Sequence, residues 1–184
     1  MKSFLKWFGL GFAGLIAILV LVGFLLPSSY RISRSIEIQK SVDEVFPLVN
    51  NLKNQQKWSP WREMDPDMKI EWGSVLEGKG AKYSWTGPKS GEGSMEITES
   101  VQNEKIVTAL DFEQQGQATA DFLFEPTGDN SVKVTWGFDG TPGMDLVGRY
   151  FGLIMESMLG PDYEKGLSHL KKLAETGEAA NQVD

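Results

Sequence analysis

The sequence predicts an α+β protein: a seven-stranded antiparallel sheet followed by a long C-terminal helix, preceded by one transmembrane helix. Three observations lead to this prediction. Residues 7–26 are an uninterrupted run of uncharged, mostly apolar residues. Between residues 29 and 138, seven stretches alternate apolar and polar side chains, which is typical of half-buried strands. From residue 144 to 175, apolar residues recur at spacings of three and four, as in an amphipathic helix.

The apolar run has the length of a membrane span. At about 1.5 Å per residue it covers roughly 30 Å, the thickness of a bilayer's hydrocarbon core. Two lysines precede the run and two arginines follow it soon after, which favours a cytoplasmic N-terminus with the rest of the chain outside. A cleaved signal peptide is the alternative, although its apolar region is normally only ~7–15 residues long. We therefore expect residues 1–29 to form an uncleaved single-pass anchor and a short linker.

The composition excludes several functions. The chain has 18 basic and 25 acidic residues, and two of the lysines precede the apolar run, so the rest has 16 − 25 = −9 charges. This acidic body argues against a nucleic-acid partner, because Lys and Arg supply most of the affinity for phosphates. There is no cysteine and only one histidine. Disulfides, thiolate metal sites and His-rich metal sites are therefore excluded, and no metal or cofactor is expected.

The first predicted strand covers residues 29–40, with its isoleucines on one face. Ser41 and Glu44 have the spacing of a capping box, which predicts a helix over residues 41–49. A proline inside that segment should keep the helix short or bent. A second short helix is expected over residues 51–58.

Six more strands follow after Pro66. They are predicted at residues 68–75, 81–86, 94–101, 105–112, 118–126 and 131–138. The connections between them are short, and residues 126–130 are expected to form a hairpin turn, so the sheet should be antiparallel. Pro161 should kink or divide the long helix. Residues 176–184 are polar and are predicted to form a tail.

This order of elements, with particular sequence stretches, resembles the START-like, polyketide cyclase/dehydrase and lipid-transport superfamily (SRPBCC). The stretches are "SIEIQKSVDEVFPLVNNLKNQQKWSPW", "GKG" and "GEG" turns, "VKVTW", and "GPDYEKGLSHLKKL". The resemblance covers about Ile32–Leu173 and is strongest to a bacterial branch with one membrane helix before the domain. It implies a helix-grip fold over residues 30–175, in which a curved sheet grips the final helix around an apolar cavity. It also implies a bacterial inner membrane location, with the domain in the periplasm given the predicted orientation.

Within such a fold, the one-sided strand residues and the inward stripe of the helix should line the cavity. The expected ligand-binding residues are Tyr83, Trp85, Phe112, Phe122, Phe124, Trp136, Phe138, Ile154, Met155 and Met158. Trp58 and Trp61 are expected at the cavity rim, with Trp58 packing inward and Trp61 nearer the entrance. This set suits a flexible apolar ligand, because ligand pockets are mostly apolar with few polar groups. The alternative is that the same residues fill a core.

No catalytic residue is predicted. His169 lies in the last turns of the long helix, where a cation is favoured by the helix end. The acids Glu63, Asp65 and Asp67 are interpreted as a solvated rim. Asp139 and Asp145 remain as another possible carboxylate pair, but both are expected in exposed loops.

The leading functional hypothesis is a membrane-anchored domain that binds a hydrophobic small molecule or lipid without chemistry. One alternative is an enzyme of the cyclase or hydrolase type that acts on an apolar substrate in the same cavity. The other is a membrane-tethered structural or interaction module with a filled core. The superfamily includes carriers, ligand sensors and enzymes, so the resemblance does not decide among these. The sequence predicts no particular protein partner.

Overall fold

A computed structural model describes residues 2–113 and 116–182, with side chains from residue 7 onward. The predicted seven strands are present and form one antiparallel sheet. The strand order is β1-β7-β6-β5-β4-β3-β2, so the first strand pairs with the last. The strands are β1 (Tyr30–Ile38), β2 (Lys69–Trp72), β3 (Lys82–Gly87), β4 (Gly91–Val101), β5 (Lys105–Asp111), β6 (Gln117–Gly128) and β7 (Ser131–Gly140).

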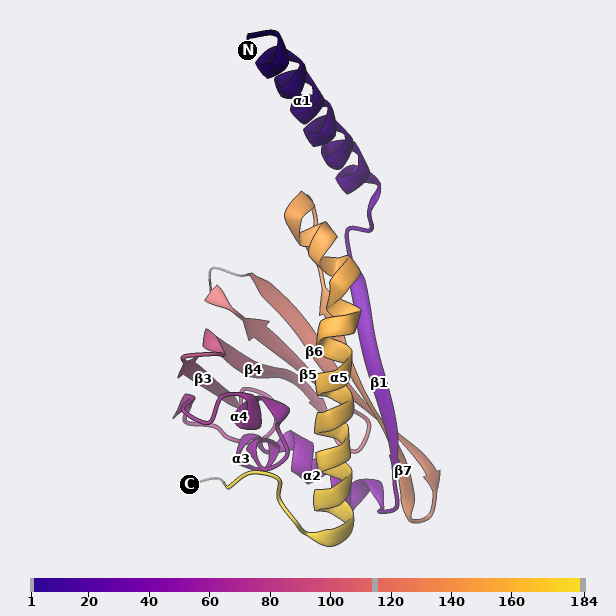
Figure 1. Cartoon of the computed structure of the whole chain (residues 1–184). Coiled ribbons are helices and arrows are strands. Elements are labelled where there is room, and N and C mark those ends of the chain that lie inside the picture. Colours follow the sequence, from indigo (N-terminus) through magenta and orange to yellow (C-terminus); the bar gives the residue numbers. More distant parts are fainter. Residues whose placement is uncertain (1, 114–115, 183–184) are drawn as a thin grey trace.

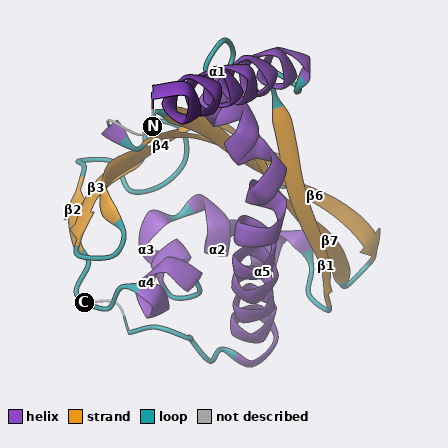
Figure 2. Cartoon of the chain, turned by 45° about the horizontal axis from the view of Figure 1, so that its top comes forward, coloured by secondary structure: helices purple, strands orange, loops and turns teal. Residues whose placement is uncertain are grey.

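Helices lie within the curve of the sheet. Figure 2 shows the sheet bending around the long helix α5 (Leu146–Thr176), with three short helices beside it. These are α2 (Val42–Asn50), α3 (Leu52–Gln56) and α4 (Pro60–Met64). The predicted α+β fold, with a curved sheet around a long C-terminal helix, is therefore confirmed. The first helix, α1 (Lys2–Leu25), projects from one end of the domain (Figure 1).

Helix α1 contains the predicted span. Its segment Trp7–Leu25 has 19 residues, a mean hydropathy of 2.6, and only 6% of its residues buried. By length and composition it is apolar and long enough to cross a membrane. The same properties also fit a signal sequence.

The short helices begin at sequence signals. In α2, the Ser41 backbone N–H donates to Oε2 of Glu44 over 3.2 Å, as the capping box predicts. Helix α4 was not predicted. Pro60 is the first residue of α4, where a proline costs little because that N–H has no helical partner.

Several boundaries differ from the predictions; for example, β2 ends at Trp72 rather than at residue 75, and β4 begins at Gly91 rather than at residue 94. The β6–β7 turn consists of Asp129 and Asn130 alone, because β6 extends to Gly128, into the predicted five-residue connection. Helix α5 is a single helix that continues through Pro161 rather than being divided there. The residues on its two sides differ sharply in burial.

The C-terminal half of α5 packs into the core, whereas the N-terminal half does not. Tyr163, Leu167 and Leu170 are at most 2% exposed and pack against the sheet and α2. The predicted inward stripe of the first half is instead largely exposed. It consists of Val147 (65% exposed), Phe151 (53%), Ile154 (48%) and Met158 (56%). The helical periodicity was correct, but this part of the helix borders an open cavity.

Candidate functional site

A cavity of about 950 Å³ lies between the sheet, helix α4 and the N-terminal half of α5. Most of its walls are aromatic and aliphatic side chains. Among the predicted binding residues, those that line it are Tyr83, Trp85, Phe112, Phe122, Trp136, Phe138, Met155 and Met158. The volume and the apolar walls are typical of small-molecule sites, which range over about 300–1,000 Å³.

Two predicted lining residues lie elsewhere. Phe124 shares the strand face of Phe122, but its ring packs against Phe46 of α2, with ring centroids 5.2 Å apart. Helix α2 fills the space under that end of β6, so Phe124 belongs to the core. Ile154 is 48% exposed and is absent from the cavity wall. It follows the helical spacing of Val147 and Phe151, but its side chain points outside the cavity.

Both rim tryptophans touch the cavity, at different depths. Trp58, expected at the rim, is 1% exposed and forms part of the inner wall. Its indole Nε1–H donates to the Leu48 carbonyl over 2.9 Å. Trp61 is half-buried in the first turns of α4. Trp58 therefore closes the core beneath the short helices.

A stack of rings packs against Trp58 in the cavity wall. Trp136 of β7 lies between Phe122 of β6 and Tyr163 of α5, with ring centroids 5.1 Å and 3.8 Å apart. Trp58 meets Trp136 edge-on at 5.6 Å. Such ring pairs add about 0.5–1.5 kcal/mol each beyond their buried area. On this side, the cavity wall is therefore made of rings that contact one another.

Polar groups also line the cavity, and burial raises the pKa of four of them, Tyr30, Tyr83, Asp162 and Tyr163. Burial raises the pKa of Tyr83 to about 12, so its hydroxyl stays neutral at physiological pH. Burial also raises the pKa of Asp162, although nearby Lys165 opposes this shift. The Thr108 hydroxyl donates to the Ala120 carbonyl over 3.2 Å, so its proton is already engaged. Tyr83 and Asp162, together with Tyr30 and Tyr163, are candidates to bind a polar group of a ligand.

The acids after α4 do not form a uniformly solvated rim. Asp65 is 1% exposed, and its Oδ2 accepts hydrogen bonds from Lys89 N at 3.0 Å and Ser90 N at 2.8 Å. Burial by itself would raise the pKa of Asp65, but the bonds from Ser90 and Lys89 outweigh it and lower the pKa. Asp65 thus fastens the β3–β4 turn to α4, whereas Glu63 and Asp67 are exposed.

The remaining titratable candidates do not form a catalytic group. Asp139 pairs with Arg31, and Asp145 caps α5 by accepting from Val147 N at 3.0 Å, so the two carboxylates have separate roles. His169 is half-buried and is not part of the cavity wall. Among the described residues, no group of three or more His, Cys, Asp or Glu side chains is arranged to hold a metal ion.

Several lining residues were not predicted. Leu110 of β5 and Ala118 and Ala120 of β6 line the cavity and share strand parity with the predicted Phe112 and Phe122, so their alternation was an available signal. Met95 also lines the cavity, from β4, for which no cavity residue was predicted. Polar residues of the short helices, such as Gln55, gave no such signal. Their placement depends on how the helices pack on the sheet.

The cavity opens between α4 and the N-terminal half of α5. Its wall includes Met64, Val147, Phe151 and Met158, whose side chains are 44–65% exposed. The mouth therefore has an apolar border. It lies on the half of α5 nearest to α1 (Figure 1).

Comparisons with known proteins agree with this geometry. The family described as "Polyketide cyclase / dehydrase and lipid transport" matches residues 29–175. A search of curated proteins found no match.

Solved structures share the fold at low sequence identity. A norcoclaurine synthase point mutant from Thalictrum, in complex with a transition state analogue, has a TM-score of 0.62 and 14% identity, covering 82% of this chain and 97% of that one. Protein CV1439 from Chromobacterium violaceum has a TM-score of 0.57 and 17% identity, covering 81% and 99%. DynU16, from the dynemicin biosynthetic locus, has a TM-score of 0.57 and 14% identity; the match covers 83% of this chain but 49% of DynU16.

Proposed function

The chain belongs to the polyketide cyclase / dehydrase and lipid transport family, and we propose that it is a membrane-anchored domain that binds a hydrophobic small molecule or lipid in its cavity. The cavity is the observation on which this proposal rests. At about 950 Å³ it is large enough for a drug-sized or larger apolar ligand. A structural module with a filled core would not retain such a space, because protein interiors are close-packed.

The character of the walls favours binding over chemistry. Aromatic rings and methionines surround the space, and methionine side chains adapt to irregular apolar shapes. The polar groups of Tyr83 and Asp162 suit the orientation of one polar end of a ligand. Helix α1 supports a location at a membrane, where long apolar molecules are abundant.

The test is to identify what the protein retains. The full chain is extracted from membranes in mild detergent and analysed by native mass spectrometry. Ala118→Phe fills the cavity from β6, and we expect it to abolish the retained mass while leaving the melting temperature unchanged. Thr119→Phe is the matched control, because Thr119 is the next residue on the strand and faces solvent. No retained mass in the native protein, and no binding of added fatty acid or phospholipid, would refute the proposal.

The second candidate is an enzyme that acts on an apolar substrate in the same cavity. The observation that favours it is the set of cavity groups with raised pKa values, since such groups gather at active sites. The structural relative named as a norcoclaurine synthase is an enzyme with the same fold. Asp162→Asn separates the candidates. Under the binding proposal it leaves the retained ligand chemically unchanged, whereas under the enzyme proposal the retained species shifts from product to substrate.

A further inference from the structure

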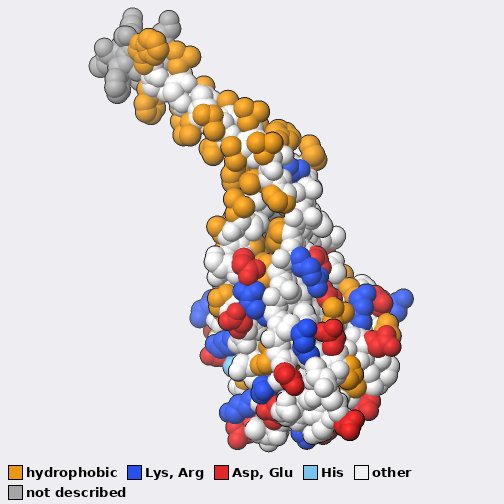
Figure 3. Space-filling view, turned by 90° about the vertical axis from the view of Figure 1, so that its right-hand side faces the viewer, with side chains coloured by type: hydrophobic (Ala, Val, Ile, Leu, Met, Phe, Trp, Pro, Cys, Tyr) orange, Lys and Arg blue, Asp and Glu red, His pale blue; other side chains and the backbone are white. Residues whose placement is uncertain are grey.

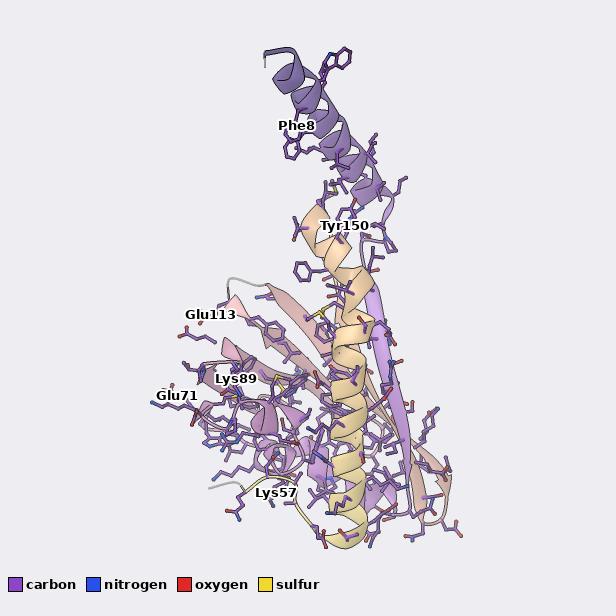
Figure 4. All side chains as sticks on the ribbon, viewed as in Figure 1. Phe8, Lys57, Glu71, Lys89, Glu113 and Tyr150 are labelled. Atoms are coloured by element: carbon purple, nitrogen blue, oxygen red, sulfur yellow. The ribbon has the colours of Figure 1, made fainter. Side chains whose placement is uncertain are left out.

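The end of α1 is joined to the beginning of α5. The Tyr150 hydroxyl donates to the Leu19 carbonyl over 2.6 Å. Gly23 is buried at the same contact, where an added Cβ would lie 3.3 Å from Leu146 and Tyr150. Figure 4 shows Tyr150 at this junction, with Phe8 far from the domain. The first two turns of α5 therefore lie beside residues 19–23 of α1.

A buried arginine fastens the junction. The Nη1 of Arg149 donates to the carbonyls of Gly23, Phe24 and Leu26 over 3.3, 3.0 and 3.1 Å. Its Nε donates to the Gly143 carbonyl over 2.8 Å. The C-terminal carbonyls of a helix favour a cation, so this arrangement stabilises both the arginine and the end of α1. The charge is turned away from the surface, and Arg149 is only 9% exposed.

The length of α1 then determines where this junction lies. Residues 7–26 together span about 30 Å, the thickness of the hydrocarbon core. If residues 19–26 were in water, the remaining residues 7–18 would span only about 18 Å, which is too short to cross. An α1 that spans the bilayer therefore carries the beginning of α5 into the membrane surface.

The surface at that level is apolar. Met144, Val147 and Phe151, here called the α5 tip, are 74%, 65% and 53% exposed. Between residues 141 and 155 the only charged residues are Asp145, which caps the helix, and the buried Arg149. In Figure 3 the charged side chains gather on the part of the domain away from α1. The cost of leaving the α5 tip in water would be removed by contact with lipid.

We propose that the α5 tip inserts into the same membrane as α1, so that the cavity mouth meets lipid and an apolar ligand enters from the bilayer. Val147 and Phe151 connect the two parts of this proposal, because they belong both to the exposed tip and to the cavity wall. The proposal rests on the anchoring and the apolar ligand proposed above. It adds the surface that touches lipid and the route by which the ligand enters.

The absence of cysteine makes a direct test simple. Nitroxide labels are attached to single-cysteine variants of the full chain, reconstituted in vesicles of phosphatidylethanolamine and phosphatidylglycerol. The positions are Met144→Cys in the tip, Leu15→Cys in α1, and Ser168→Cys at an exposed position in the C-terminal half of α5. Met144 and Ser168 are matched exposed sites outside the cavity wall. Relaxation by oxygen, which concentrates in lipid, is compared with relaxation by a water-soluble nickel chelate.

We expect oxygen to dominate at positions 15 and 144 and nickel to dominate at position 168. A tip label that behaves like the label at 168, while the label at 15 is in lipid, would overturn the tip proposal and leave the anchor intact. A tip label shielded from both reagents would indicate a contact with a second copy of the chain, and would also overturn it. A label at 15 that is relaxed by nickel would refute the membrane anchor itself, and the tip proposal with it.

Entry from lipid is tested with the tip variant Met144→Asp. An aspartate costs free energy in lipid, so the variant should take up a fluorescent phospholipid from vesicles several-fold more slowly than the native protein. Its uptake of the same phospholipid from detergent micelles should be unchanged, because Met144 is outside the cavity wall. Equal uptake rates of the variant and the native protein from vesicles would refute entry at the tip. Loss of uptake by the variant from both vesicles and micelles would show that the substitution damages the cavity, and would refute the role assigned to Met144.

Discussion

Trp58→Ala should destabilise the domain strongly. The side chain is 1% exposed, and a buried tryptophan removes about 150–250 Å² from water, equivalent to roughly 4–6 kcal/mol. The alanine side chain still buries some apolar area, so the cost is smaller, and measured Trp→Ala truncations cost about 3–5 kcal/mol. One side of the ring faces the cavity, so the packing loss lies at the low end. Removing the hydrogen bond to Leu48 adds about 1 kcal/mol, for a total near 4 kcal/mol.

The change is measurable by thermal unfolding in detergent, followed by far-ultraviolet circular dichroism. For a domain of this size, about 4 kcal/mol corresponds to a fall in Tm of roughly 8–16 °C. Trp58→Phe keeps a ring and removes the N–H donor, so it should lose much less. Trp61→Ala, at a half-buried position, should also lose less. If Trp58→Ala melted like the native protein yet lost its ligand, Trp58 would be a gate and the packing argument would fail.

Two further predictions concern charged residues. Asp65→Asn should lower the free energy of unfolding at neutral pH, because the bonds from Ser90 and Lys89 that lower the pKa of Asp65 stabilise the native carboxylate. That stabilisation is fully present above the pKa of Asp65 in the unfolded chain, about 4, and it is lost as the pH falls through the lower pKa of the folded state. In urea denaturation, the free energies of unfolding of the native protein and the variant should therefore converge in acid. Arg149→Ala should widen the distribution of distances between spin labels in α1 and the domain, measured by pulsed electron resonance, more than Tyr150→Phe does.

Each of these two predictions would be contradicted by one result. An Asp65→Asn protein as stable as the native protein at pH 7 would mean that the bonds to the β3–β4 turn contribute nothing net. A distance distribution left unchanged by Arg149→Ala would mean that the contact at Gly23 alone fixes the angle of α1.

The sequence predicted those parts of the fold that depend on local patterns. Strand alternation identified all seven strands, and the capping box located the start of α2. The helical spacing of apolar residues predicted that α5 turns an apolar stripe toward the sheet, and in its C-terminal half Tyr163 and Leu167 are buried. Each of these features depends on residues that are close in the sequence, so its signal is complete within one segment.

The errors concern packing between distant segments. Phe122 and Phe124 have the same parity in β6, and only the position of α2 makes one a cavity residue and the other a core residue. Asp65 follows a short helix and precedes a proline, a context that predicts solvent. It is buried by a turn 24–25 residues later, which no local pattern reveals. Arg149 was missed because its partners are carbonyls of α1 more than 120 residues earlier.

The pairing of β1 with β7 has a consequence for biosynthesis. Arg31 faces Asp139, which is synthesised 108 residues later. At about 5–20 residues per second, β1 waits roughly 5–20 seconds for its only strand partner. Unpaired strands are prone to aggregate, yet every second residue of β1 between Arg31 and Glu37 is charged or a serine. We expect this polar face to limit aggregation of the nascent chain until translation reaches the end of the sheet.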